Sequence, residues 1–227
     1  MTPKIYALVP AAGTGTRLGD SLPKQYLDIS GKPLIFHTLD AIARVSRVAK
    51  IVVVLSPEDR HWQSLMGDQL AGRMIVLPVG GRSRAESVSN GLAALTEVAR
   101  DDWVMVHDAA RPCIRTELIE QFIDELFDDP IGGLLALPLA DTIKRDDGGL
   151  RVAATVPREG IWRAQTPQMF RHGMLLDALR KHPQATDEAQ AIEQLGHQPR
   201  LVLGDSANLK VTYAPDLKLA RMLLSEG

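Results

Sequence analysis

The sequence predicts an α/β fold in which a mostly parallel sheet lies between two layers of helices. Short apolar runs alternate with amphipathic helical patterns along the chain, as they do in parallel α/β proteins. The run Ile51–Leu55 is rich in β-branched residues, which is typical of a strand buried on both faces. With 227 residues, of which 45% are hydrophobic, the chain can bury the core that this Rossmann-like, three-layer fold requires.

Six apolar runs are predicted to form the strands of this sheet. Each is short and is followed by glycine, proline or polar residues that end it. The predicted strands are Lys4–Val9, Ile51–Leu55, Met74–Pro78, Trp103–Val106, Gly133–Leu137 and Arg200–Leu203.

Helices are predicted between the strands from apolar residues at helical spacing. Residues 33–45 show this spacing at Leu34, Ile35, Leu39, Ile42 and Val45. Three further helices are predicted from their first residues: Ser83 opens a capping box with Glu86, and Thr116 and Thr186 are expected to be N-caps.

One segment interrupts the alternation. Residues 139–165 are polar and rich in β-branched residues, and the run Asp146-Asp147-Gly148-Gly149 predicts a hairpin turn between strands at Thr142–Arg145 and Leu150–Val156. A two-stranded hairpin cannot bury both of its faces alone. We therefore expect a β-arm inserted at about residues 139–162 of a single domain spanning residues 1–227, with a second subunit as its packing partner. An ordinary surface excursion is the alternative.

The first predicted strand leads into a glycine-containing loop, AAGTGTRLGDSLPKQYL, which holds Arg17 and Lys24. Such a loop presents backbone N–H groups and two cations to an anion, most simply a phosphate. A P-loop is excluded because Lys24 does not follow a glycine, and a dinucleotide fingerprint is excluded because Gly19 stands one residue too far from Gly15. A glycine turn without a ligand stays open.

Two further strand ends carry candidate binding residues. Gly80 and Gly81 precede the capped helix, where a flat ligand can approach the backbone. Asp108 and Arg111 follow the fourth strand, and in open α/β sheets ligands bind beyond the carboxyl ends of strands. Asp108 is therefore suited to hold a divalent metal, and Arg111 is suited to hold a phosphate. A structural ion pair between the two, or a tight turn without a ligand, is the alternative, and His107 is expected to be structural.

Further cations and neutral polar residues lie where such an anion-binding site would need them. Any one of them is more commonly a solvated surface residue, but their concentration at strand ends and on the hairpin favours a site. They are Thr142, Lys144, Arg158, Arg163, Thr166, Asn208 and Lys210.

Composition excludes several classes of protein. A net charge of −2 argues against general binding to nucleic acid or membranes. The single cysteine, Cys113, excludes an intrachain disulfide and fits a reducing compartment. Neither a signal peptide nor an apolar run of membrane-spanning length occurs, so a cytoplasmic location is expected.

A set of motifs in order along nearly the whole chain carries a resemblance to a known family. The motifs are AAGTGTRLGDSLPKQYL, VGGRSRAESVSNGL, VHDAARP, DTIKR, VPREGIWRAQTPQMF, TDEA and NLKVT. Together they resemble those of the 2-C-methyl-D-erythritol 4-phosphate cytidylyltransferases of the non-mevalonate isoprenoid pathway. The opening loop alone marks only nucleotidyltransferases, whereas the segment from DTIKR to VPREGIW favours the specific family.

The resemblance implies a role for each matching residue. Arg17, Lys24 and Lys210 are the implied catalytic residues, and Asp108 is also the implied ligand of Mg²⁺ or another divalent cation. Residues implied to bind CTP are Ala11, Ala12, Gly13, Gly15, Gly81, Ser87 and Asp108. Residues implied to bind the second substrate are Arg111, Thr142, Arg158 and Thr166, with Thr142 and Arg158 supplied by the partner's arm in a homodimer.

The implied reaction is in-line attack of the methylerythritol phosphate on the α-phosphorus of CTP, with release of pyrophosphate. The alternative within this chemistry is a cytidylyltransferase for ribitol 5-phosphate or ribulose 5-phosphate. A nucleotide-binding module without activity is a second alternative, although it does not need the cations of the second substrate.

Overall fold

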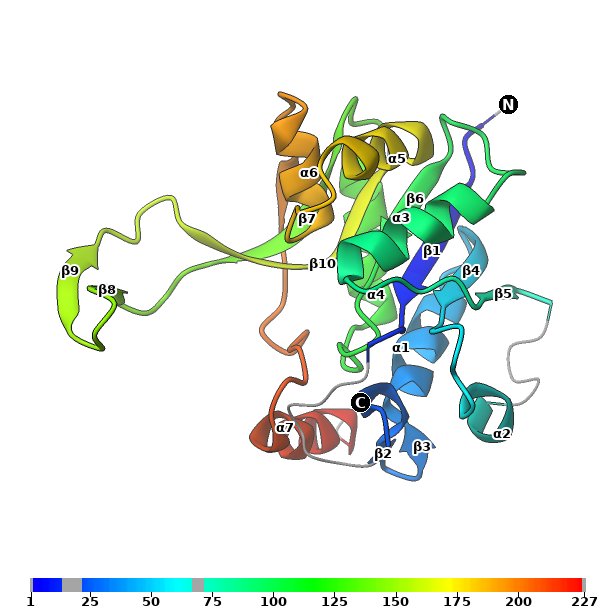
Figure 1. The fold of residues 1–227 in the computed structure, drawn as a ribbon, viewed down its shortest axis with the longest axis horizontal. Helices are drawn as coiled ribbons and strands as arrows, with labels where there is room; N and C mark the ends of the chain where they lie inside the picture. The colour runs from blue at the N-terminus through cyan, green and yellow to red at the C-terminus, as the bar shows by residue number, and fades with distance from the viewer. Residues whose placement is uncertain (1, 14–21, 67–71, 226–227) are drawn as a thin grey trace.

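The computed structural model describes residues 2–13, 22–66 and 72–225, and a seven-stranded sheet lies at the centre of these residues (Figure 1). The strand order is β11-β7-β10-β6-β1-β4-β5. All neighbours are parallel except β10, which runs antiparallel to β6 and β7. The strands are β1 (Ile5–Pro10), β4 (Val48–Val54), β5 (Met74–Leu77), β6 (Trp103–Val106), β7 (Gly132–Pro138), β10 (Trp162–Arg171) and β11 (Arg200–Leu203).

Helices cover both faces of the sheet, so the predicted three-layer α/β fold is confirmed. Side chains of β1 alternate between two cores: Ala7 and Val9 belong to one, and Leu8 belongs to the other. The first core lies under α1 (Leu34–Ala43) and α4 (Thr116–Leu126). The second lies under α3 (Arg84–Ala94), α5 (His172–Lys181) and α6 (Glu188–Gln194).

Smaller elements surround this body. They are η2 (Lys24–Tyr26), β2 (Asp28–Ile29), β3 (Lys32–Pro33), α2 (Trp62–Met66) and α7 (Ala214–Ser225). The α7 helix packs beside β2, where Arg221 donates to the backbone oxygen of Asp28. In the part of the chain that the structure describes, no helix combines the length and the apolar character needed to cross a membrane.

The six predicted strands are confirmed, but β10 was missed. Its polar residues Gln165, Thr166 and Gln168 are almost fully buried, so it lacks the apolar run that predicts a central strand. These side chains can be buried because they are hydrogen-bonded. For example, the Gln168 amide donates to Asp187, and Thr166 accepts from the backbone N–H of Asp108.

The predicted helix caps have mixed outcomes. Ser83 caps α3, because its hydroxyl accepts from the backbone N–H of Glu86. The second bond of a capping box differs: the Glu86 carboxylate accepts from the backbone N–H of Arg82 instead of that of Ser83. The prediction for Thr116 was wrong, because its hydroxyl donates to Ala41 and makes no cap. Thr186 was also wrong: the N-cap of α6 is the next residue, Asp187, whose carboxylate is the stronger acceptor.

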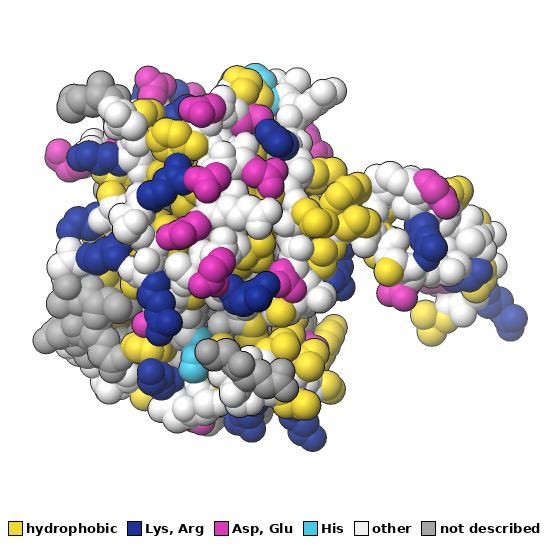
Figure 2. All heavy atoms as spheres, turned by 180° about the vertical axis from the view of Figure 1, so that it is seen from behind, with side chains coloured by type: hydrophobic (Ala, Val, Ile, Leu, Met, Phe, Trp, Pro, Cys, Tyr) yellow, Lys and Arg dark blue, Asp and Glu magenta, His cyan; other side chains and the backbone are white. Residues whose placement is uncertain are grey.

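The predicted hairpin is confirmed as a two-stranded sheet of β8 (Ile143–Asp146) and β9 (Val152–Val156). It extends away from the body as an arm (Figures 1 and 2). Its turn is held by Asp147, which accepts from the backbone N–H groups of Gly149 and Arg151. Figure 2 also shows hydrophobic side chains gathered where the arm leaves the body.

Candidate active site

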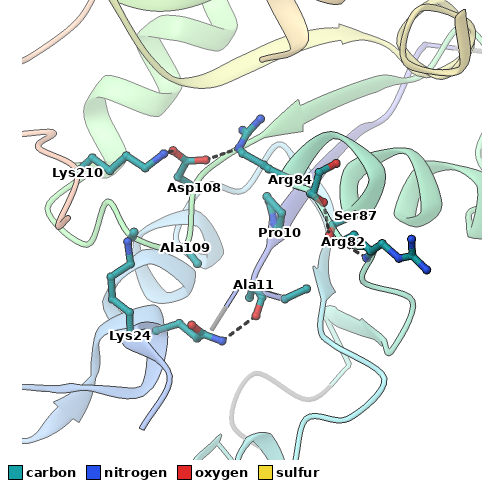
Figure 3. Close-up of a pocket in the computed structure, with 15 residues that line it drawn as sticks. Pro10, Ala11, Lys24, Arg82, Arg84, Ser87, Asp108, Ala109 and Lys210 are labelled. Carbon is teal, nitrogen blue, oxygen red and sulfur yellow. Dashed lines mark hydrogen bonds and ion pairs between the residues drawn. The ribbon is translucent and has the colours of Figure 1, made fainter. Parts of the chain in front are cut away.

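A cavity of about 550 Å³ opens at the carboxyl edge of the sheet (Figure 3). The loops that follow β1, β5 and β6 supply most of its wall, and the first turn of α3, η2 and the segment after β11 complete it. This is the edge where open α/β sheets bind ligands. The predicted residues that line it are Ala11, Ala12, Gly13, Lys24, Gly81, Ser87, Asp108 and Lys210.

Other predicted residues do not line the cavity. Gly15 and Arg17 lie outside the described residues. Arg111 and Thr166 are buried behind the cavity wall. Thr142 and Arg158 are exposed residues of the arm, which extends away from the body of the protein (Figure 1), and neither lines the cavity.

The loop after β1 is held close to the loop after β5. The backbone N–H of Ala11 donates to Val54, and the buried Gln25 amide donates to the carbonyl of Ala11. A Cβ at Gly80 would stand 2.3 Å from the Cβ of Ala12 and 2.7 Å from the carbonyl oxygen of Leu55. Glycine is therefore required at position 80 for the two loops to meet, a role that the sequence analysis did not assign to it.

The turn at Gly81 is fixed by Ser87. The Ser87 hydroxyl accepts from the backbone N–H of Gly81 (3.0 Å) and donates to the carbonyl of Ser83 (2.9 Å). Because its single proton is used in this way, Ser87 can offer a ligand only an acceptor lone pair in this arrangement.

Asp108 is the centre of the charged side of the cavity. Its Oδ1 accepts from Nε of Arg84 (2.8 Å) and its Oδ2 from Nζ of Lys210 (2.7 Å), whereas Arg111 Nε is 3.8 Å away. Burial alone raises the pKa of a carboxyl, but Arg84 and Lys210 outweigh it and hold the pKa of Asp108 well below its ordinary value. The ion pair between Asp108 and Arg111 that was expected as the alternative is present, but at 3.8 Å it is the longest of the three; the closer partners of Asp108 are Arg84 and Lys210.

Arg84 and Glu188 were not predicted as site residues. Arg84 lines the cavity and makes two bonds to the carboxylate of Glu188, at 2.7 and 3.1 Å. Burial lowers the pKa of a guanidinium, but Glu188 and Asp108 together raise that of Arg84 above its ordinary value. The pair is separated by 104 positions, so no local spacing could have predicted it.

Lys24 and Lys210 approach the cavity from segments that are bonded to each other. The Lys24 ammonium donates to the carbonyl of Val211 (2.8 Å), and the backbone N–H of Val211 donates to Ala110 (2.8 Å). Figure 3 shows both lysines on the same side of the cavity, with Lys210 directed at Asp108. Two cations thus face a space bounded by the N–H-bearing loop at Ala11–Gly13.

His107 and Thr166 support Asp108 from behind. Thr166 Oγ1 accepts from the backbone N–H of Asp108 (3.0 Å) and lies 3.1 Å from Nδ1 of His107. Burial lowers the pKa of His107 to about 4, so the ring is neutral at pH 7. Arg111 donates to the backbone oxygen of Asn208 (2.6 Å), and burial lowers its pKa. The placement of His107 agrees with the structural role expected for it.

Cys113 is buried beside α7 and does not line the cavity. Burial raises the pKa of its thiol to about 11, so it is not an activated nucleophile. Within the described ranges, no cluster of three or more His, Cys, Asp or Glu residues has the arrangement of a metal site. Asp108 is the acidic residue among those lining the cavity.

The comparison with protein families identifies the family to which the chain belongs. The sequence model for 2-C-methyl-D-erythritol 4-phosphate cytidylyltransferase matches residues 5–226. The chain belongs to this family. The family resemblance expected from the motifs is thereby confirmed over nearly the whole chain.

Individual relatives agree with this family. A protein of Dechloromonas aromatica (strain RCB) named 2-C-methyl-D-erythritol 4-phosphate cytidylyltransferase is 54% identical over 223 residues, covering 98% of each chain. One of Thiobacillus denitrificans with the same name is 54% identical over 229 residues, again with 98% of each chain covered.

Solved structures extend the agreement to the fold. A crystal structure of 4-diphosphocytidyl-2C-methyl-D-erythritol synthase has 40% identity and a TM-score of 0.87, covering 99% of this chain and 100% of the other. The 2-C-methyl-D-erythritol 4-phosphate cytidylyltransferase of Francisella tularensis has 32% identity and a TM-score of 0.84, covering 97% and 99%. The sheet, the arm-bearing insertion and the cavity loops are thus parts of a chain aligned along nearly its full length with members of this family.

Proposed function

We propose that this protein transfers CMP from CTP to 2-C-methyl-D-erythritol 4-phosphate in the formation of isoprenoid precursors. The products are 4-diphosphocytidyl-2-C-methyl-D-erythritol and pyrophosphate. The family match over residues 5–226 supports this activity, and relatives that share about half of its residues carry the name of this enzyme. The names also favour it over the ribitol and ribulose phosphate alternatives.

The observation that carries the proposal is the set of cations around one cavity. Lys24, Arg84 and Lys210 line it, in a protein whose net charge is −2. Two polyanions that repel each other must be brought together for this reaction, and local cations lower that cost. An oxygen of the methylerythritol phosphate forms a bond to the α-phosphorus of CTP, while the bond from that phosphorus to the β-phosphate oxygen breaks. The attacking phosphate is already ionised at neutral pH, so no strong base is required.

CTP binding is assigned to the loops of β1 and β5. The backbone of Ala12, Gly13 and Gly15, together with Arg17, cradles the phosphates, and Ala11, whose N–H is already bonded to Val54, lines the cavity beside them. Gly81 and Ser87 form the wall against which the cytosine rests, and Asp108 lies toward the ribose and the phosphates. Lys24, Arg17 and Lys210 stabilise the charge that develops on the α-phosphoryl oxygens.

Asp108 is also the proposed ligand of Mg²⁺ or another divalent cation. A carboxylate has about four lone-pair positions, so its bonds to Arg84 and Lys210 leave capacity for one metal contact. Mg²⁺ commonly uses one or two carboxylates together with substrate phosphates and water, and a single Asp108 in the cavity wall fits that pattern. When bound there, the ion neutralises phosphate charge.

Arg111, Thr166, Thr142 and Arg158 are proposed to serve the second substrate. Arg111 and Thr166 lie directly behind Asp108. Thr142 and Arg158 lie on the arm, from which they can reach the cavity of a partner subunit. This supports a homodimer in which each arm completes the other subunit's site. Exposed hydrophobic side chains near the base of the arm, Ile161 and Trp162, suit such an interface.

The remaining proposals concern the organisation and location of the protein. One domain, residues 1–227 with the arm inserted at about 139–162, is supported by a sheet whose strands come from both halves of the chain. A cytoplasmic location is supported by the single, unpaired cysteine. Nucleic acid and membranes are not proposed as partners.

A two-substrate assay tests the activity. The purified protein is incubated with CTP, Mg²⁺ and either 2-C-methyl-D-erythritol 4-phosphate or ribitol 5-phosphate, and pyrophosphate release is measured. We expect turnover with the first substrate and little with the second. Turnover only with ribitol 5-phosphate refutes the substrate, and no turnover with any polyol phosphate refutes the activity.

A further inference from the structure

Glu188 is a fully buried carboxylate that reaches the cavity wall through one side chain. Its two oxygens accept from Nη1 and Nη2 of Arg84, at 2.7 and 3.1 Å, and the residue has no exposed surface. A charge buried to this degree is costly unless it is paired with good geometry. The pair is bidentate, which is the geometry that fixes a guanidinium in both position and orientation.

Arg84 passes this constraint on to Asp108. While its two terminal nitrogens hold Glu188, its Nε donates to Oδ1 of Asp108 at 2.8 Å. The other oxygen of Asp108 holds Lys210 at 2.7 Å. The result is a row of alternating charges, Glu188–Arg84–Asp108–Lys210, of which the last three line the cavity. Figure 3 shows Arg84 and Lys210 on opposite sides of Asp108.

Glu188 is itself held from the central sheet. It is the first residue of α6, and the buried Gln168 of β10 binds the residues on both sides of it. The Gln168 amide donates to Asp187 at 3.0 Å and accepts from the backbone N–H of Ala189 at 2.8 Å. The backbone on both sides of Glu188 is therefore tied to the central sheet by buried hydrogen bonds.

We propose that Glu188 is a positioning residue for nucleotidyl transfer, acting through Arg84. This proposal rests on the function proposed above. A triphosphate in the cavity is a strong competitor for a guanidinium, because arginine binds phosphate in the same bidentate manner as carboxylate. Glu188 occupies both terminal nitrogens and keeps Arg84 beside Asp108. Asp108 in turn holds the ammonium of Lys210 at the cavity wall, so that both cations act on the substrate from fixed positions.

The main test is Glu188→Gln, which keeps the shape of the side chain and removes its charge. We expect kcat to fall about 10- to 100-fold, by analogy with the loss found when groups that orient metal ligands are removed, while KM for CTP changes less than about threefold. Both are measured per folded protein, with the folded fraction taken from circular dichroism. Glu193→Gln is the matched control, because Glu193 is an exposed residue of the same helix and should keep the wild-type kcat.

A double-mutant cycle tests whether the effect passes through Arg84. In the Arg84→Gln background, adding Glu188→Gln should lower kcat by no more than about twofold, because the contact through which Glu188 acts is already gone. If Glu188→Gln alone does not fold, Glu188→Asp replaces it: it keeps the charge but withdraws the carboxylate by one methylene, and a partial loss of kcat is expected.

Three results overturn the proposal. The first is a wild-type kcat in Glu188→Gln, or in Glu188→Asp where that variant replaces it, and the second is a rise in KM with unchanged kcat in the same variant. The third is a further tenfold loss of kcat when Glu188→Gln is added to Arg84→Gln. Wild-type protein in the same assay separates the two levels of inference. If it does not transfer CMP to methylerythritol phosphate, the proposed function fails. If it does and the variants match it, only the positioning role fails.

Discussion

The cavity wall and the arm place their charged side chains in opposite settings. In the wall, Asp108 is buried and bound by Arg84 and Lys210. On the arm, Arg158 donates to the backbone of Ala140, and Lys144 donates to Thr155 at 2.7 Å, and all of these bonds are solvent-exposed. The wall is therefore organised within one chain, whereas the charges of the arm bond to the arm itself and remain open to a partner.

The physical reason for this difference is desolvation. A buried charge must be paired, because its uncompensated burial costs several kcal/mol, so the pairs of the wall are required for the fold as well as for the chemistry. The arm contacts of Arg158 and Lys144 are exposed hydrogen bonds to neutral oxygens. Surface substitutions usually change stability by no more than about 0.5 kcal/mol, so the fold tolerates the loss of these bonds. Variants of the buried pairs should accordingly affect both stability and activity, whereas variants of the arm should affect activity with little change in stability.

The largest effect is expected at the cavity. Lys24→Ala should lower turnover by about 10²- to 10³-fold, because it removes one charge that stabilises the transition state. Lys50→Ala is the matched control: Lys50 is also half-buried and donates to one backbone carbonyl, that of Gly72, outside the cavity. Steady-state kinetics with thermal unfolding measures both. Turnover near wild type in folded Lys24→Ala contradicts the catalytic role of Lys24.

The free energy of unfolding should depend on pH through His107, which is buried behind Asp108 in the cavity wall. The pKa of His107 is lowered from 6.5 to about 4 by burial. Between these values the unfolded chain binds a proton that the native state does not, so the free energy of unfolding decreases as pH falls. The decrease from this group is about 3 kcal/mol between pH 7 and pH 4.

Urea unfolding of the wild type and of His107→Asn across this range measures the contribution. The variant is less stable at pH 7 but should lose less stability on acidification than the wild type. Equal pH dependence of the two proteins contradicts the assignment of a buried, neutral His107.

On the arm, Arg158→Ala should reduce turnover roughly 10- to 100-fold, the effect of losing one charge-assisted hydrogen bond to a phosphate. Its thermal stability should stay near that of the wild type, since the Arg158 bond is exposed. Mixing this variant with Lys24→Ala then tests whether sites are shared. In a heterodimer, one of the two sites receives an intact Lys24 and the partner's intact arm. Recovery of activity supports shared sites, and verified heterodimers without recovery refute them.

The smallest effect compares single hydrogen bonds in the two regions. Ser83→Ala removes the N-cap of α3 beside the cavity and should cost about 1 kcal/mol of stability. Lys144→Ala removes an exposed bond of the arm and should stay within about 0.5 kcal/mol of the wild type. Urea unfolding measures the loss of stability in both variants. Equal losses would contradict the difference between a hydrogen-bonded cavity wall and a solvent-exposed arm.

Local patterns in the sequence determined much of this molecule. Apolar runs and turn residues predicted six strands of the sheet and the hairpin at residues 142–156, because side-chain periodicity and turn chemistry act over a few residues. The motifs also identified the family. Asp108, Arg111 and Lys210 could be named because they follow strands, and the carboxyl ends of parallel strands meet at one edge. Ala11 and Ser87 were named from the resemblance to the family.

Only the tertiary structure decided what depends on distant partners. It brought Glu188 to Arg84 across 104 positions, and it showed that polar residues such as Gln168 can lie in a buried strand because bonds from other segments satisfy them. It also placed Thr166 behind Asp108 rather than in the cavity wall. Burial and charge pairing are properties of the assembled fold, since their free energies arise from neighbours that sequence spacing does not specify.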